Sequence, residues 1–457
     1  MFTTSQFEAC LSDLVDAANV LKEQCRDTGS PDATPDSTDA RRNVLTATSR
    51  LQRLLFQPID FIQHLTSRNQ LLACLQWLGE FHILAYIPLS GCVSIKDVAD
   101  LADVPETQLQ RVVRIMAMAG FMSEPTPGFV KHTLISAGFL NRPALLDAGM
   151  FLGETAAPFA LRMAATTRCR HEDFPSDRQS DDSSGASSSA SSGPISWRLP
   201  GNSDKQSFQS AYQQRPKLQR QWPAYFRCLG DAASCGTVAL LSQLNWASLG
   251  NACIVDVGGQ SLGAVTTLAK LYPQLHFVVQ TEDATTPAAA SNHMATAAIS
   301  GDAELSGRIT ARKRASGTPQ TLQTAAVYLV RLSHHNPLVP LRSRVSIELR
   351  AHLGVLEANR SALLILMVQV LPEPGALDEH TEGMARVRDM ALLQLVDGGD
   401  LVEEEVMAMV DGVRDENGRL AVVKKLCCRD SAEVAIGIKY QNDENRKQQL
   451  AFMPETI

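Results

Sequence analysis

The sequence predicts an α/β protein that has a helical, winged-helix first part and a doubly wound sheet in its second part. After residue 207, apolar runs of strand length alternate with helical patterns, the order that builds a parallel sheet with helices on both faces. Before it, two helical patterns lead into a Pro/Gly hairpin at 125–128. A chain of 457 residues is long enough for two or three domains.

The bulk composition argues against several classes of protein. The net charge is -7, which argues against binding of nucleic acid over the whole surface of the protein. The ten cysteines are scattered and none has C-x-x-C spacing, so we expect no metal site. We find no signal peptide and no run of about 18 apolar residues, and therefore expect an intracellular protein with free thiols and no membrane contact.

The N-terminal segment 1–28 has helical spacing of its apolar residues and is predicted to form an amphipathic helix. Such a helix either packs on its own domain or binds a partner. The polar, Pro/Gly-punctuated stretch 29–43 is predicted to be a linker.

Residues 44–165 are predicted to form a winged-helix domain. Ser94 can cap the first of two helices, Pro105 can start the second, and Gly120 can end it before the hairpin. The second helix presents Arg111 and Arg114 outward, but four nearby acidic residues would repel phosphate. We therefore favour a role in packing or dimerisation over direct DNA contact.

Two segments are predicted to lack a folded core. Residues 168–206 are serine-rich and acidic, and cannot bury enough apolar surface to order themselves. They form either a flexible insertion or a target for phosphorylation. Residues 441–457 are predicted to be a polar tail.

The most informative motif lies in the predicted sheet domain, 207–440. The sequence VDVGGQSLG at 255–263 follows a buried strand and precedes a helix and a second strand, HFVVQ at 276–280. Strand, glycine-rich turn, helix and strand form the βαβ unit that holds an adenosine cofactor, because glycines allow positive φ and close approach to the ligand. Two of the expected glycines are replaced, by Gln260 and Leu262.

This turn resembles the cofactor turn of the fungal and plant small-molecule O-methyltransferases that use S-adenosylmethionine. The resemblance extends to LPEPG at 371–375, Asp389-Met390, Asp397-Gly398 and the winged helix at 58–140. It implies an N-terminal winged-helix dimerisation domain, a C-terminal Rossmann-like methyltransferase domain, and a homodimer formed through the winged helix. It also implies a set of cofactor-binding residues: Asp256, Gly258, Gly259, Gly263 and Glu282.

The departures from this family suggest a degenerate site. By resemblance, Leu262 would project into the methionine or ribose space, and Gly263 would allow a shifted turn. Thr281 stands where the family has an acid that binds the ribose, with Glu282 one residue later. Loss of such a charge-assisted hydrogen bond costs about 1.5–3 kcal/mol.

The resemblance also assigns His335 as the candidate general base, with His334 beside it. The family's flanking Asp and Trp are here Asn336 and Pro337. Of the two acids that normally orient the base, one is replaced by Val368, and Asp400 stands where a glutamate often lies. His335 is therefore either a vestigial base or a loop histidine without a catalytic role.

The departures resemble a subset of the family, the transcriptional coactivators of aflatoxin-type polyketide clusters in filamentous fungi. This resemblance implies a catalytically degenerate coactivator that works with a zinc-cluster transcription factor, in the nucleus as well as the cytoplasm, without a cofactor. The alternative is an active O-methyltransferase that uses S-adenosylmethionine to modify an aromatic polyketide hydroxyl. Direct DNA binding through the winged helix is the third reading, and charge makes it the least favoured.

Overall fold

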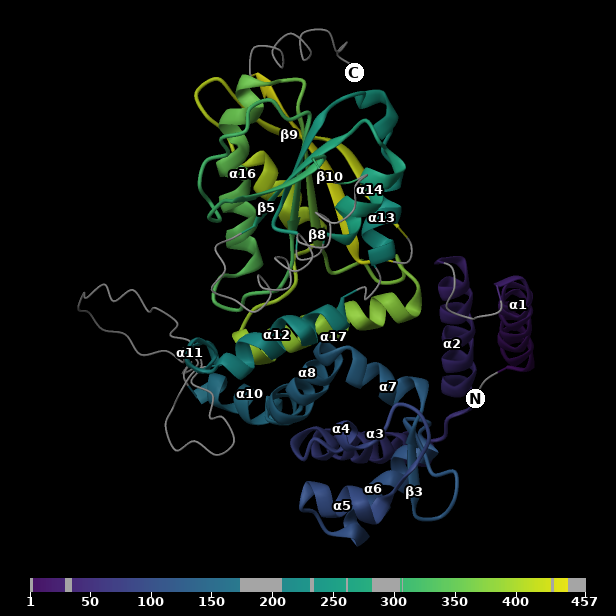
Figure 1. Cartoon of the computed structure of the whole chain (residues 1–457). Coiled ribbons are helices and arrows are strands. Elements are labelled where there is room, and N and C mark those ends of the chain that lie inside the picture. Colours follow the sequence, from purple (N-terminus) through teal and green to yellow (C-terminus); the bar gives the residue numbers. More distant parts are fainter. Residues whose placement is uncertain are drawn as a thin grey trace, which may run out of the picture. The chain divides into compact units, whose positions relative to one another are not determined.

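The computed structural model describes residues 3–28, 35–172, 208–230, 234–259, 262–281, 305, 307–428 and 431–442. Its contacts divide the chain into two compact units, Met1–Ala137 and Gly138–Ile457 (Figure 1). Most of the predicted insertion 168–206 and of the tail 441–457 lies outside the described residues.

Unit 1 begins with two paired helices, α1 (Thr4–Thr28) and α2 (Pro35–Leu55), joined by an ion pair of 3.1 Å between Arg50 and Asp13. Helix α2 begins inside the segment that we expected to be a linker, so residues 35–43 are helical. Proline suits the first turn of a helix, and Ala40 and Ala47, two turns apart, are buried on one face.

The rest of unit 1 contains the predicted winged helix. Its elements are α3 (Pro58–Glu80), α4 (Ile83–Tyr86), β1 (Val93–Ser94), α5 (Ile95–Ala102), α6 (Glu106–Met118), β2 (Met122–Ser123) and β3 (Phe129–His132). The strands form a sheet in the order β1-β3-β2. Gly120, with φ +74°, ends α6 as predicted, whereas Ser94 stands at the N-cap of α5 without a capping side-chain hydrogen bond.

Unit 2 begins with a helical layer. Its helices are α7 (Leu134–Asn141, which crosses the unit boundary), α8 (Pro143–Phe151), the π-helix η1 (Leu152–Ala156), α9 (Ala157–Leu161), α10 (Met163–Glu172), α11 (Phe208–Gln214) and α12 (Pro216–Leu229). Residues 138–165 thus belong to unit 2 and not to the winged helix, where we had placed them. The cause is an aromatic cluster in which Phe151 and Phe208 pack around Trp222.

One helical run in this layer, Pro143–Leu161, is long and apolar enough to cross a membrane by length and composition alone. The sequence analysis had found no such run. Here its residues Phe151 and Phe159 are buried in the aromatic cluster with α12.

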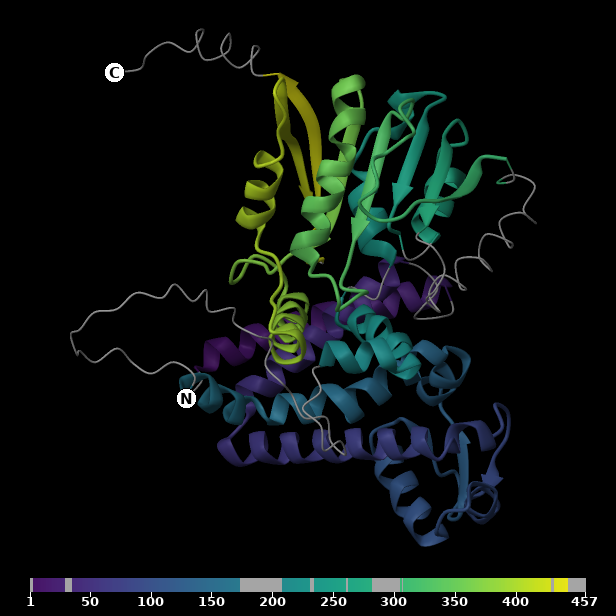
Figure 2. The same ribbon diagram turned by 90° about the vertical axis from the view of Figure 1, so that its left-hand side faces the viewer.

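The remainder of unit 2 is a seven-stranded sheet in the order β6-β5-β4-β7-β8-β10-β9 (Figure 2). All neighbouring strands are parallel except β10, which is antiparallel to both β8 and β9. The strands are β4 (Cys253–Val257), β5 (His276–Thr281), β6 (Ile309–Lys313), β7 (Val327–Leu332), β8 (Leu363–Gln369), β9 (Gly418–Cys427) and β10 (Glu433–Asn442).

Helices cover both faces of this sheet, as a doubly wound fold requires. The helices are α13 (Ser234–Ser242), η2 (Trp246–Leu249, a 3-10 turn), α14 (Gly263–Leu271), α16 (Leu341–Ala358) and α18 (Glu403–Asp411), whereas α17 (Glu379–Val396) packs in the helical layer with α11 and α12. Helices α13 and α14 share one hydrophobic core with the sheet, and α16 and α18 share the other.

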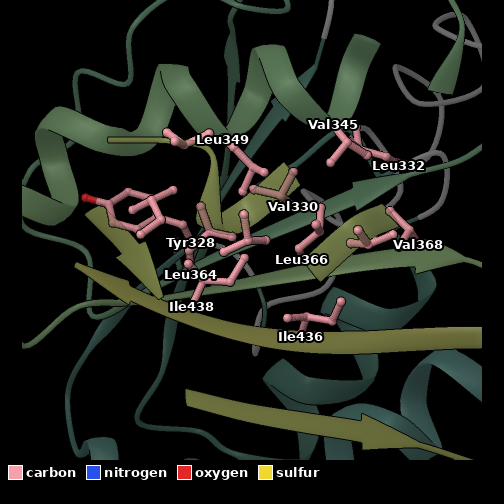
Figure 3. Packing of buried hydrophobic residues seen from close by; sticks show 14 of the residues in the cluster. Tyr328, Val330, Leu332, Val345, Leu349, Leu364, Leu366, Val368, Ile436 and Ile438 are labelled. Carbon is pink, nitrogen blue, oxygen red and sulfur yellow. The ribbon is translucent and has the colours of Figure 1, made fainter. Parts of the chain in front are cut away.

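Alternation along the strands separates the two cores. Tyr328, Val330 and Leu332 of β7 face α16, while Leu329 faces the α14 side (Figure 3). Burial of one such side chain contributes about 1.5–3 kcal/mol. This packing holds the carboxyl ends of β4, β5 and β7 in register, which is where a doubly wound fold places its functional site.

Candidate functional site

The glycine-rich turn follows β4 directly. Gly258 has φ +75°, and a Cβ built there would lie 2.7 Å from the backbone oxygen of Arg331. A Cβ at Gly259 would lie 1.8 Å from Arg331 Nη2. Gly258 therefore needs glycine because of its positive φ and the close β7 backbone, whereas a side chain at Gly259 would displace only the guanidinium of Arg331.

Arg331 and Asp256 form a bidentate ion pair beside this turn. Arg331 Nε lies 2.8 Å from Asp256 Oδ1 and Nη2 lies 2.5 Å from Oδ2. Asp256 is fully buried and Arg331 nearly so. Burial lowers the pKa of Arg331, but the charge of Asp256, the hydrogen bond to Asp256 and the charge of Glu433 together outweigh burial, so the pKa is raised. Both oxygens of the Asp256 carboxylate are thus occupied within the chain.

Leu262 is buried at the start of α14. It is the N-cap residue of α14 with φ −77°, a conformation that carries a Cβ without strain. Its side chain is 8% exposed and packs in the core with Val265 and Leu268. Gly263 is the first residue of α14. Gln260 lies outside the described residues.

The position to which the family resemblance assigns ribose binding is the end of β5. Thr281 is the last residue of this strand and is half-buried, and its carbonyl accepts a hydrogen bond from Arg314 N at 3.0 Å. Glu282 lies outside the described residues. Within the described part of the turn, Asp256 is held by Arg331 and Thr281 supplies only a hydroxyl. Within the described residues, this position therefore offers the ribose of S-adenosylmethionine a hydroxyl and no free carboxylate.

The second candidate site is the loop after β7, where His334 and not His335 contacts the acid. His334 Nε2 lies 2.7 Å from Asp400 Oδ1, and Arg388 Nε donates to Asp400 Oδ2 at 2.7 Å. The backbone oxygen of His334 accepts a hydrogen bond from Trp222 Nε1 at 2.6 Å. All four side chains are buried. The loop after β7 is therefore held by two contacts of His334, one from its side chain to Asp400 and one from its backbone oxygen to Trp222.

His335 turns toward Arg344 instead. Its Nδ1 lies 3.1 Å from Arg344 Nη1. Desolvation of the ring and the charge of Arg344 lower the pKa of His335 to about 3. An imidazole with this pKa is a weak proton acceptor near neutral pH, so the geometry does not favour His335 as a general base.

A cavity of about 180 Å³ lies beside this histidine loop. Trp222, Ser333, His334 and Asn336 are among its lining residues, whereas Asp256, Gly258 and Gly259 are not. No group of three or more His, Cys, Asp or Glu side chains that could hold a metal occurs in the described part of the chain.

Sequence reasoning missed two partners in these sites. Arg388 is buried among the apolar residues of α17, and an arginine within an apolar helical pattern is the signal that could have revealed it. No sequence pattern indicated the pairing of Arg331 with Asp256, because it arises only when β4 and β7 are neighbours in the sheet.

Comparison with known proteins identifies the family. A family model described as the trypacidin cluster transcriptional coactivator tpcD N-terminal domain matches residues 4–56. The trypacidin cluster transcriptional coactivator tpcD of Aspergillus fumigatus is 39% identical over 453 residues, which cover 96% of this chain and 97% of tpcD. The chain belongs to this family of fungal transcriptional coactivators. A transcriptional coactivator of Pseudocercospora fijiensis is 51% identical over 374 residues, covering 82% of this chain and 97% of the relative.

The aflatoxin cluster transcriptional coactivator aflS of Aspergillus parasiticus also belongs to the family. It is 36% identical and the alignment covers 97% of this chain and 100% of aflS. The protein is thus a transcriptional coactivator of fungal secondary-metabolite clusters, which confirms the function implied by the sequence.

Solved structures confirm the O-methyltransferase fold of this coactivator. LepI in complex with SAM has a TM-score of 0.63 at 14% identity, with 94% of this chain and 100% of that chain covered. The mitomycin 7-O-methyltransferase MmcR has a TM-score of 0.55 at 16% identity, with 84% and 97% covered. The helical region followed by a mixed α/β sheet is shared with both.

Proposed function

We propose that this coactivator acts without methyl transfer and uses the O-methyltransferase fold as a scaffold for binding. The observation that carries the proposal is the Asp256–Arg331 ion pair, which engages both oxygens of the carboxylate at the glycine-rich turn. The low pKa of His335 and the position of Thr281 support it.

Calorimetric titration of the full chain with S-adenosylmethionine tests this proposal. We expect no binding up to millimolar concentrations of the cofactor. Binding in the micromolar range would overturn the proposal and favour the alternative, an active O-methyltransferase that acts on an aromatic polyketide hydroxyl. The retained Gly258 and Gly259 are the observation that keeps this alternative open.

The partner that we propose is a zinc-cluster transcription factor of the same cluster, met in the nucleus. Relatives carry the names of aflatoxin and trypacidin clusters, and a coactivator needs a transcription factor to act on. We propose an aromatic polyketide cluster as the target. A pull-down of the cluster's factor with the purified chain, together with pathway transcripts in a deletion strain, tests both points. Absence of the interaction with unchanged transcripts would refute them.

We further propose a homodimer formed through unit 1. Helix α3 exposes Ile59, Phe61 and Ile62, each more than half exposed on this helix. Clustered exposed apolar side chains are typical of interaction surfaces. Sedimentation of the wild-type chain and of Ile62→Asp tests this: we expect a dimer for the first and a monomer for the second. A wild-type monomer at micromolar concentration would contradict the proposal.

Direct DNA binding has less support. Arg114 of α6, one of the two arginines expected to face outward, forms an ion pair of 3.3 Å with Glu124. This contact lowers the positive charge that the helix offers to phosphate.

A further inference from the structure

Coactivation does not explain a cavity of about 670 Å³ in unit 2. It lies at the ends of β8 and β9, the start of β10 and the first turn of α18, and the turn that contains LPEPG forms one wall. Small-molecule pockets have volumes of about 300–1,000 Å³. The cavity therefore has the size of a ligand site.

This cavity is separate from both candidate sites described above. None of its lining residues lines the cavity beside His334, and none belongs to the glycine-rich turn. Most of its lining is apolar and comes from several elements: Val370, Leu371, Pro372, Pro374, Ala376, Leu377, Val402, Ala432 and Val434. Val370 and Val434 are also part of the core, so this wall is rigid.

The two cations that line the cavity already have partners. Lys425 Nζ lies 2.5 Å from Glu403 Oε1. Arg386 Nη2 donates to the backbone oxygen of Pro372 at 2.7 Å and lies 3.4 Å from Glu382 Oε1. Neither positive charge is therefore available for an anionic ligand without the loss of an existing contact.

Two lining carboxylates remain without a partner. The first turn of α18 has three glutamates, of which Glu403 binds Lys425, while Glu405 accepts a hydrogen bond from Val402 N and pairs with Arg342. The third, Glu404, has no side-chain hydrogen bond or ion pair within the described residues, and the same holds for Glu373 on the LPEPG turn. Both side chains are exposed and, among the described lining residues of the cavity, they contribute negative charge that no ion pair offsets.

We propose that this cavity binds a small organic cation with an apolar body. The apolar part packs against the valine and proline wall, and an ammonium or amidinium group lies near Glu373 and Glu404. The site is independent of coactivation and of the vestigial cofactor turn. A lysine or arginine of a partner protein has the right charge, but a single side chain would fill little of the volume.

Two dyes of similar size and opposite charge test the proposal on the full chain. Thioflavin T is an apolar cation and 1-anilinonaphthalene-8-sulfonate is an apolar anion. We expect equilibrium dialysis to give a Kd for thioflavin T that is roughly fivefold or more below that for the sulfonate, from two partly exposed ion pairs. Equal or reversed affinities would overturn the proposal.

Substitutions locate the site. The double variant Glu373→Gln/Glu404→Gln should weaken thioflavin T binding by roughly fivefold and should not weaken sulfonate binding, because it removes negative charge that attracts the cation and repels the anion. Glu416→Gln, on the turn before β9 and outside the cavity lining, is the matched control. Ala376→Trp, at an exposed position on the rim, should weaken binding of both dyes. Full thioflavin T affinity in the double variant would refute the assignment.

A chemical footprint checks the position independently. Cys427 lines the cavity and is exposed, whereas Cys92 is exposed in unit 1. Thioflavin T should slow maleimide labelling of Cys427, read by peptide mass spectrometry, and leave the rate at Cys92 unchanged. An unchanged rate at Cys427 would place the dye elsewhere and overturn the proposal. An oligoarginine peptide that binds more tightly than thioflavin T would show that the small-molecule occupant is wrong.

Discussion

Asp400 forms a hydrogen bond with His334, whereas His335, the next residue in the chain, contacts Arg344. The ionised Asp400 carboxylate can only accept, so the Nε2–H of His334 is the donor in the contact of 2.7 Å. Because Arg388 holds the other oxygen at 2.7 Å, the pair is part of a buried network that ties the loop after β7 to α17. We infer that this buried network contributes to the stability of the fold.

This relationship predicts different effects at two adjacent histidines. His334→Ala should lower the free energy of unfolding by about 1.5–3 kcal/mol, because Asp400 loses a charge-assisted hydrogen bond. His334→Gln should recover part of the loss, since its amide can donate to Asp400. Chemical denaturation measures both, with His335→Gln as the control in which we expect a smaller change. A larger loss at His335 would contradict the assignment.

The position of Leu262 predicts a packing defect. Leu262→Ala should lower the free energy of unfolding by about 2–3 kcal/mol, because the side chain is 8% exposed within the α14 core. Leu271→Ala on the same helix removes an equal side chain that is 59% exposed, and should change stability much less. Urea denaturation of the two variants gives the comparison, and equal losses would place Leu262 outside the core.

Close approach of β7 predicts a strong requirement for glycine after β4. Gly258→Ala combines positive φ with a Cβ 2.7 Å from the backbone oxygen of Arg331. Gly375→Ala has a similar φ of +80° but open space around its Cβ. We expect a loss of about 1–2 kcal/mol at Gly375 and a greater one at Gly258, measured by thermal unfolding. A Gly258 variant as stable as the Gly375 variant would show that the turn can move away from β7.

Buried His352 predicts a loss of stability in mild acid. Burial of the ring, and more weakly the charge of Arg314, lower its pKa to about 4 in spite of the opposing contribution of Glu348. The ordinary pKa of histidine is 6.5. As pH falls below 6.5, His352 therefore binds a proton in the unfolded chain but stays neutral in the folded chain. This contribution to stability is complete above pH 6.5 and is lost toward pH 4, by up to about 1.4 kcal/mol per pH unit.

Unfolding of the wild type and of His352→Gln between pH 4 and 8 measures this dependence. The variant should have a flatter profile than the wild type in the acid range. His276→Gln, at an exposed histidine, is the control and should keep the wild-type slope. A His352 variant with an unchanged profile would show that other groups cause the acid loss.

Local sequence patterns were sufficient to predict the fold. The contacts within the candidate sites join residues far apart in the sequence, and local patterns do not predict them. The βαβ unit, the winged helix and the doubly wound sheet follow from hydrophobic period and from turn residues such as Gly120, which act over a few neighbours. The contact between His334 and Asp400 joins residues 66 positions apart, and its geometry depends on how α17 packs. A motif count from Arg331 indicated His335, because a count along the chain does not tell which side chain a loop turns inward.

The approach of Arg331 to Gly258 and Gly259 has a consequence for recognising enzymes by signature. Gly258 is required by the backbone of the neighbouring strand and Gly259 leaves room for the Arg331 side chain, so folding alone gives a reason to retain both, whether or not the turn binds a cofactor. A search that scores VDVGG would therefore count such coactivators as methyltransferases. Under the proposed function, the residues free to drift are those whose side chains would meet only a cofactor, and we expect position 281, where the resemblance places ribose binding, to be a better diagnostic than the glycines.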